Sequence, residues 1–241
     1  MYKNYIFDLY GTLIDINTNE YSGYLWKKMQ EFYSFYGAKY TSVELKKEYN
    51  RLCMEEEQKL KEKGHDFPEI KVEYVFQKLF LNKGIEISLE TAEITTQFFR
   101  IISTKYIKLY DNVIEYLELL KKKKKKIYLL SNAQAIFTKL EMDHLDITKY
   151  FDGIVFSSDE ECRKPSKEFF EIILDRYNLK AEESVMIGND GGTDIGGANT
   201  VGMDSAYLHT NISPRDTIIK NVQATYIVED GDLGKLKKLI K

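Results

Sequence analysis

Six short apolar runs constrain the fold of this sequence most strongly. They are residues 5–7, 127–130, 153–156, 185–187, 206–208 and 226–228. Most of them are followed by small or polar residues, which is typical of buried strands that end in functional loops. Helical patterns such as 113–122 and 168–177 lie between them, and this alternation predicts an α/β protein with a doubly wound (Rossmann-like) parallel sheet. Ligands of such sheets bind at the carboxyl ends of the strands.

Residues 18–104 do not join this alternation. They contain amphipathic helical patterns and no convincing strand. Thr41 and Glu44 form a plausible capping box for one helix, and Ser88 is placed to cap another. We therefore expect a core of residues 1–17 and 105–241, interrupted by a helical domain of residues 18–104.

Composition excludes several classes of function. The 241 residues are 43% hydrophobic and carry a formal net charge of −3, so no basic field favours nucleic acid or an anionic membrane. No apolar run approaches the roughly 20 residues of a membrane span. Cys53 and Cys162 have no metal-type or redox-type spacing. We expect a cytoplasmic protein that holds a small anionic substrate by local geometry; the sequence carries no signal for its oligomeric state.

Polar residues follow the first two apolar runs. Asp8 ends the first run and is followed by Gly11, which places a carboxylate at the working edge of the sheet. Ser131 and Asn132 end the second run, where a hydroxyl and an amide can hold phosphate or carboxylate oxygens. Taken singly, these residues are also ordinary turn and helix-capping residues.

Two further motifs follow later in the chain. Lys164 precedes Pro165, and proline suits the first turn of the helix expected from residue 166. Asp190 and Asp194 lie on a glycine-rich loop after the fourth run, where two carboxylates predict an oxygen-ligand site for Mg²⁺. Taken singly, the lysine is also typical of a solvated charge and the acids of helix caps.

Together and in this order, the four motifs resemble those of the haloacid dehalogenase-like hydrolases. The resemblance covers residues 1–17 and 105–241, and the helical insert occupies the position of that superfamily's cap domain. It implies that Asp8 is a nucleophile that forms a covalent ester or aspartyl phosphate, later hydrolysed by water. Thr12 and Ser131, with backbone amides near Asn132, would orient the anionic group of the substrate. Lys164 would neutralise the charge that develops on Asp8 and on the transferring group.

The resemblance also implies a metal site. Mg²⁺ would be held by Asp8, the main-chain carbonyl of Tyr10 and Asp190, with Asp194 ligating the ion or bracing the loop. Members of the superfamily often have Gly-Asp where this chain has Gly188-Asn189, so the ligand assignment is open by one residue.

Tyr10 bears on the type of reaction. Phosphatases of the superfamily usually have a second aspartate there as acid-base, a role that tyrosine performs poorly near neutral pH. The Asp-Leu-Tyr-Gly-Thr form resembles instead the L-2-haloacid dehalogenases, which expel halide without a proton or a metal. Those enzymes grip the substrate carboxylate with an arginine where this chain has Lys27, and they have a shorter fourth motif with one acid.

Because Asp190 and Asp194 would repel each other without a cation, we favour a Mg²⁺-dependent phosphatase of small phosphorylated metabolites. Two alternatives stay open: a 2-haloacid dehalogenase, and a catalytically weak binding protein that retains the fold.

Overall fold

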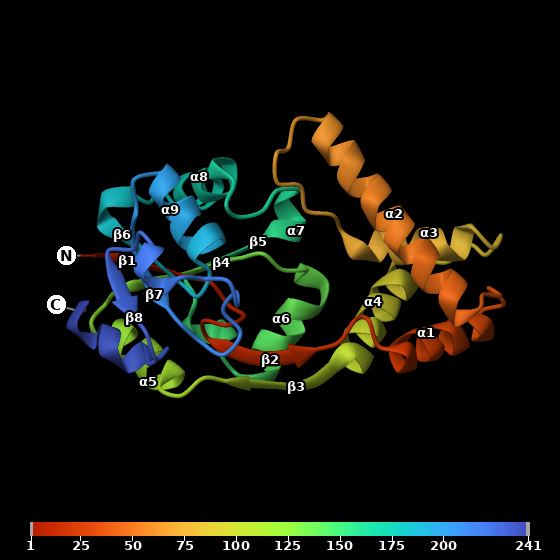
Figure 1. The fold of residues 1–241 in the computed structure, drawn as a ribbon, viewed down its shortest axis with the longest axis horizontal. Coiled ribbons are helices and arrows are strands. Elements are labelled where there is room, and N and C mark those ends of the chain that lie inside the picture. Colours follow the sequence, from red (N-terminus) through yellow and green to blue (C-terminus); the bar gives the residue numbers. More distant parts are fainter. Residues whose placement is uncertain (1, 240–241) are drawn as a thin grey trace.

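The core of the protein is a six-stranded parallel sheet with strand order β5-β4-β1-β6-β7-β8. We describe residues 2–239 in a computed structural model (Figure 1). The strands are β1 (Asn4–Phe7), β4 (Lys126–Ser131), β5 (Gly153–Phe156), β6 (Ser184–Gly188), β7 (Asp204–Leu208) and β8 (Tyr226–Val228). Each of the six apolar runs forms one of these strands, so the predicted α/β class and parallel sheet are confirmed.

Helices cover both faces of this sheet, as a buried parallel sheet requires. Alternate residues of β1 face opposite ways: Phe7 packs in one apolar cluster with α5 (Val113–Lys122) and α6 (Ala135–His144), and Ile6 in another with α8 (Lys167–Arg176) and α9 (Gly196–Thr200). In Figure 1, α8 and α9 lie above the sheet and α5 below it. The short helix α7 (Ser157–Glu160) follows β5, and the 3₁₀-helical segment Leu233–Leu239 packs on the α5 side.

Four helices form a second unit with its own core: α1 (Gly23–Phe35), α2 (Ser42–Glu62), α3 (Val72–Leu81) and α4 (Leu89–Ser103). Trp26, Tyr33, Phe76 and Phe80 are among the buried side chains that they share. Thr41 and Glu44 form the expected capping box, and the Ser88 side chain caps α4. None of the helices among residues 2–239 is both long enough and apolar enough to cross a membrane.

A two-stranded antiparallel ribbon joins the helical unit to the core. It consists of β2 (Ile14–Thr18) and β3 (Thr104–Leu109), and the sequence interpretation did not predict it. Ile16 pairs with Ile107 in its register. Each strand is too short, and too polar on one side, to be recognised without its partner.

The loop between α2 and α3 makes a second connection to the core. Pro68 pairs with Cys162 as an isolated bridge, just before Lys164. Glu69 accepts hydrogen bonds from the Ser157 hydroxyl at 3.0 Å and from Nε2 of Gln134 at 3.0 Å. The helical unit is thus attached beside the second and third motifs as well as through the ribbon.

Candidate active site

The four motifs converge at one edge of the sheet. Strands β4, β1 and β6 are neighbours, and Phe7 lies in register with Leu129 on one side and Ile187 on the other. The residues that follow these strands therefore meet at their carboxyl ends. A pocket of about 240 Å³ lies there, and its lining residues are Asp8, Tyr10, Asn132, Lys164, Asn189, Asp190, Thr193, Asp194, Ile212 and Pro214.

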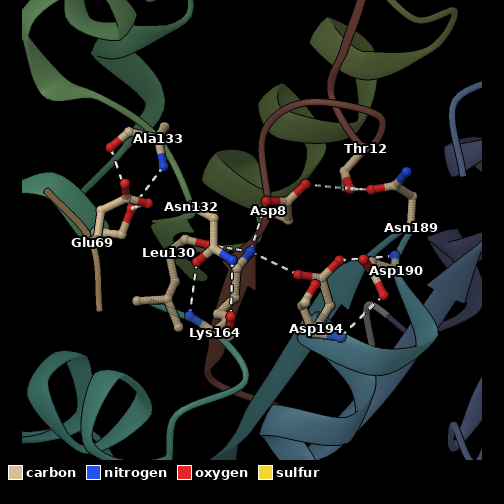
Figure 2. Close-up of polar contacts among 12 residues, drawn as sticks. Asp8, Thr12, Glu69, Leu130, Asn132, Ala133, Lys164, Asn189, Asp190 and Asp194 are labelled. Atoms are coloured by element: carbon tan, nitrogen blue, oxygen red, sulfur yellow. Dashed lines mark hydrogen bonds and ion pairs between the residues drawn. The ribbon is translucent and has the colours of Figure 1, made fainter. Parts of the chain in front are cut away.

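The Lys164 ammonium lies between two buried carboxylates (Figure 2). Its Nζ is 2.7 Å from Oδ1 of Asp8 and 2.7 Å from Oδ1 of Asp194, and it donates to the Leu130 carbonyl at 2.9 Å. Burial lowers the pKa of Lys164, but the two carboxylates outweigh burial and raise it overall, so the side chain stays charged. Burial raises the pKa of Asp194; Lys164 opposes that shift and Asp8 adds to it.

Asn132 holds the Lys164 main chain. Its Nδ2 donates to the Lys164 carbonyl at 3.0 Å, and its Oδ1 accepts from the Lys164 amide at 2.8 Å. The Asn132 side chain therefore positions the lysine, and the residue also lines the pocket. Pro165 follows through a cis peptide bond. It lies directly before Ser166, the N-cap of α8, so the expected helix follows Pro165 as predicted.

The turn after Asp8 packs against the fourth motif. The Thr12 hydroxyl donates to Oδ2 of Asp8 at 3.1 Å and lies 3.4 Å from Oδ1 of Asn189. Gly11 has a φ of +87°, and a Cβ there would lie 2.2 Å from Nδ2 of Asn189. Only glycine allows both this backbone conformation and this close approach.

Ser131, the last residue of β4, has a buried hydroxyl that lacks a hydrogen-bond partner within the described chain. Leaving such a group unsatisfied costs about 1–3 kcal/mol. Ser131 lies between Leu130 and Asn132, which both contact Lys164, but it is not among the residues that line the pocket.

The acids of the fourth motif also shape their own loop. Asp190 Oδ1 accepts from the amides of Gly192 at 2.8 Å and Thr193 at 3.0 Å, which caps the π-helical turn Gly191–Ile195. Asp194 Oδ2 accepts from the Asp190 amide at 3.0 Å. Asp190 itself borders the pocket, so its second carboxylate oxygen is available to a ligand there.

The Tyr10 hydroxyl is engaged outside this charged cluster. It donates to Glu141 of α6 and lies 3.0 Å from Oγ1 of Thr138. Glu141 in turn accepts from Arg100 of α4, whose guanidinium lies 5.3 Å from the centre of the Tyr10 ring. Burial raises the pKa of Tyr10 further above its ordinary value, and Glu141 adds to the shift. A hydroxyl held in this way is a poor acid or base near neutral pH.

The donor set fits a hard divalent cation. Three carboxylates, those of Asp8, Asp190 and Asp194, border a pocket whose lining contains one cation, Lys164. Mg²⁺ is typically bound by one or two carboxylates together with water and substrate phosphate oxygens. Among residues 2–239, no group of three or more His, Cys, Asp or Glu side chains could hold a metal ion by itself, so water and substrate oxygens would have to complete the coordination of a bound Mg²⁺.

Sequence reasoning missed several residues around this pocket. Thr193, Ile212 and Pro214 line it, and Glu141 anchors Tyr10. Ile212 and Pro214 follow β7, and their only signal was their place after a strand's carboxyl end. Lys27, the counterpart of the dehalogenase arginine, is exposed and is not among the lining residues.

Known proteins share this architecture. The haloacid dehalogenase-like hydrolase family matches residues 2–202. A 2-haloacid dehalogenase from Pseudomonas syringae pv. Tomato DC3000 aligns over 99% of both chains, with a TM-score of 0.66 and 17% identity. The Bacillus subtilis protein YfnB, whose structure was determined with bound magnesium, aligns over 99% of this chain and 98% of its own, with a TM-score of 0.56 and 19% identity. At these identities the structures show the common fold alone.

Curated relatives are phosphatases by name. Glyceraldehyde 3-phosphate phosphatase of Methanothermobacter thermautotrophicus is 30% identical over 133 residues, 54% of this chain and 58% of that protein. The enzyme of the same name from Pyrococcus furiosus is 25% identical over 206 residues, 86% of this chain and 80% of its own. Several curated matches cover less than two thirds of the relative's length, down to 27%. The family match spans most of the chain, and the chain belongs to the haloacid dehalogenase-like hydrolases.

Proposed function

We propose that this hydrolase is a Mg²⁺-dependent phosphatase of small phosphorylated metabolites that acts through an aspartyl phosphate on Asp8. The observation that carries the proposal is the Lys164 ammonium, 2.7 Å from both Asp8 and Asp194 at the base of a polar pocket. A buried cation beside a carboxylate nucleophile offsets the charge that a phosphoryl group brings. The phosphatase names of the curated relatives support the same reaction class.

The first step is a displacement at phosphorus. One carboxylate oxygen of Asp8 attacks, a bond from Asp8 to phosphorus forms, and the bond to the leaving oxygen breaks. Ser131, whose buried hydroxyl has no partner among residues 2–239, donates to a phosphoryl oxygen, and Lys164 offsets the negative charge. Thr12 holds Asp8 in place through its 3.1 Å hydrogen bond.

The second step is hydrolysis. Water attacks the phosphorus of the aspartyl phosphate, releases inorganic phosphate and restores the Asp8 carboxylate. Because the Tyr10 hydroxyl is bonded to Glu141, solvent water supplies the proton that the leaving oxygen takes up in the first step. The enzyme should therefore be slow, or should prefer phosphate esters with good leaving groups.

Mg²⁺ would be held by Asp8, the Tyr10 carbonyl and Asp190, with Asp194 as a further ligand or a brace. When bound, the ion would offset negative charge on the phosphoryl oxygens. Asn189 offers a neutral amide oxygen on the same loop. Calorimetric titration of the Asp190→Asn and Asn189→Ala variants with Mg²⁺ tests which of the two side chains is a ligand. Loss of a true ligand weakens Mg²⁺ binding even when no substrate is present.

The test of the reaction is a screen of phosphorylated metabolites and 2-halo acids, each with Mg²⁺ and with chelator. We expect phosphate release that requires Mg²⁺ and disappears in Asp8→Asn. Halide release in the presence of chelator would instead establish the second candidate, 2-haloacid dehalogenation. That candidate is favoured by one observation: Tyr10 contributes no proton, and a halide leaving group needs none.

A further inference from the structure

The loop between α2 and α3 pairs with the segment of the core that leads to Lys164. The Glu69 amide donates to the Glu161 carbonyl at 3.0 Å. The Arg163 amide donates to the Phe67 carbonyl at 2.9 Å. These two hydrogen bonds run in opposite directions across an antiparallel bridge, so they form a short ladder between the helical unit and the core. The ladder ends one residue before Lys164, whose backbone it therefore helps to place.

The Glu69 side chain extends this contact toward the second motif. The side chain is 13% exposed, and its carboxylate accepts from the Ser157 hydroxyl and from Nε2 of Gln134, each at 3.0 Å. Burial raises the pKa of Glu69, and the Arg163 guanidinium, 3.9 Å away, opposes the shift. Replacing Glu69 by alanine would remove the acceptor that these two core side chains share.

The same hydrogen bonds reach the residues that hold Lys164. The Ser157 hydroxyl accepts from the Ala133 amide at 2.9 Å, and Asn132 directly precedes Ala133. The Asn132 side chain bonds both the amide and the carbonyl of Lys164 (Figure 2). Lys164 is thus held from two sides, by the ladder and by Asn132, and Glu69 contributes to both.

The position of the Lys164 ammonium matters because its charge acts over a short distance. Its Nζ is 2.7 Å from Asp8 and 2.7 Å from Asp194, and the lysine side chain is 1% exposed. A displacement of about 1 Å at a reacting centre can cost about 100-fold in rate, even when the substitution that causes it lies far from the chemistry. The backbone that carries Lys164 must therefore be fixed for the ammonium to stay beside Asp8.

We propose that Glu69 is a positioning residue: by fixing residues 161–163 and the second motif, it holds the Lys164 ammonium beside Asp8 for phosphoryl transfer. This inference rests on the proposed phosphatase function and adds a residue of the helical unit to it. Glu69 does not line the pocket beside Asp8, so its effect on the reaction passes through Lys164. The attachment of the helical unit at this loop then matters for the chemical step as well as for stability.

Hydrolysis of 4-nitrophenyl phosphate with magnesium chloride present measures the effect on the reaction. We expect Glu69→Ala to lower kcat/KM by about 10- to 100-fold. Glu69→Gln, which keeps one acceptor oxygen, should retain more activity than Glu69→Ala. Lys71→Ala is the matched control, because it removes an ion pair of the same loop, to Asp159 at 3.7 Å, and leaves the ladder and the Glu69 carboxylate in place. It should keep the kcat/KM of the wild type.

Two further measurements separate positioning from a merely structural role. In a Lys164→Met background the charge that Glu69 positions is absent, so Glu69→Ala should add no further loss of kcat/KM. The second measurement needs no turnover. The ¹H–¹⁵N NMR signal of the Lys164 ammonium, assigned by its absence in Lys164→Met, should shift or broaden in Glu69→Ala and stay unchanged in Lys71→Ala.

The proposal is overturned if Glu69→Ala keeps the kcat/KM of the wild type, if it loses the same factor with and without Lys164, or if the Lys164 ammonium signal is unchanged. If Glu69→Ala does not fold, Glu69→Gln and Ser157→Ala alter the same chain of hydrogen bonds and are judged by the same criteria. Failure of the phosphatase proposal is distinct: the wild type would hydrolyse no phosphate ester, while the ammonium signal would still change in Glu69→Ala.

Discussion

Replacing Glu141 by Gln tests how the helical unit of α1 to α4 is connected to the turn that carries Asp8. Nε of Arg100 donates to Oε1 of Glu141 at 2.5 Å, and Nη2 donates to Oε2 at 3.2 Å. The two side chains are 10% and 13% exposed. The Arg100 guanidinium also lies 4.6 Å from the centre of the Phe137 ring. The substitution removes the carboxylate that is bonded to a nearly buried arginine and leaves it the attraction of Glu20, while the amide that replaces the carboxylate retains an acceptor oxygen for Tyr10.

Breaking a fully buried ion pair costs about 3–5 kcal/mol. Here both side chains border a cleft of about 480 Å³ between α4, β3 and α6, so water can reach the charged side chain that remains when its partner is replaced. We therefore expect Glu141→Gln to lower the free energy of unfolding by about 2–3 kcal/mol. Arg100→Met should cost a similar amount, because it leaves the carboxylate unpaired.

Urea unfolding of the full chain, followed by circular dichroism, measures these differences. The double variant Arg100→Met/Glu141→Leu should recover most of the loss, since an apolar pair of similar volume needs no counter-charge and packs against the Tyr10 and Phe137 rings. A single-variant cost below about 0.5 kcal/mol would place the pair in the class of exposed, weak salt bridges and refute the reasoning. So would a double variant whose cost equals the sum of the two single variants.

Three shorter predictions concern the reaction and the cap. Asp8→Asn should abolish release of both phosphate and halide with the fold intact by circular dichroism; retained turnover would reject the covalent mechanism. Tyr10→Asp should raise steady-state phosphatase turnover by up to about 100-fold by restoring an acid-base, and Tyr10→Phe should leave turnover unchanged; a loss of turnover in Tyr10→Phe would show that the hydroxyl takes part in catalysis. Burial raises the pKa of Glu69, with Arg163 opposing, so its contribution to stability is fully present below the unfolded pKa of about 4.5 and is lost as pH rises through the folded pKa. The urea midpoint of Glu69→Gln should therefore rise relative to that of the wild type between pH 4.5 and 7. A difference between the two midpoints that stays constant with pH would contradict the raised pKa of Glu69.

The sheet could be predicted from the sequence because its strands are buried on both faces. Such strands are short, continuous apolar runs, and a run of this kind can be recognised without knowledge of its neighbours. The caps at Thr41 and Ser88 were predictable for a similar reason, since a capping side chain acts within three residues of its own helix. Asp8, Ser131, Lys164 and Asp194 could be named as candidate site residues from the order of their motifs along the chain.

Only the tertiary structure decided how these residues act on one another. The sequence placed Tyr10 two residues after Asp8, yet its hydroxyl is bonded to Glu141, 131 positions away along the chain. Nothing in the sequence indicated that the Asn132 side chain holds the Lys164 main chain. The β2–β3 ribbon and the presence of Ile212 and Pro214 in the pocket lining could not be predicted, because both depend on partners distant in sequence. Local patterns determine which elements form and which residues end them. The direction of a side chain, its partner and its charge state depend on packing between elements, and only the folded chain specifies this packing.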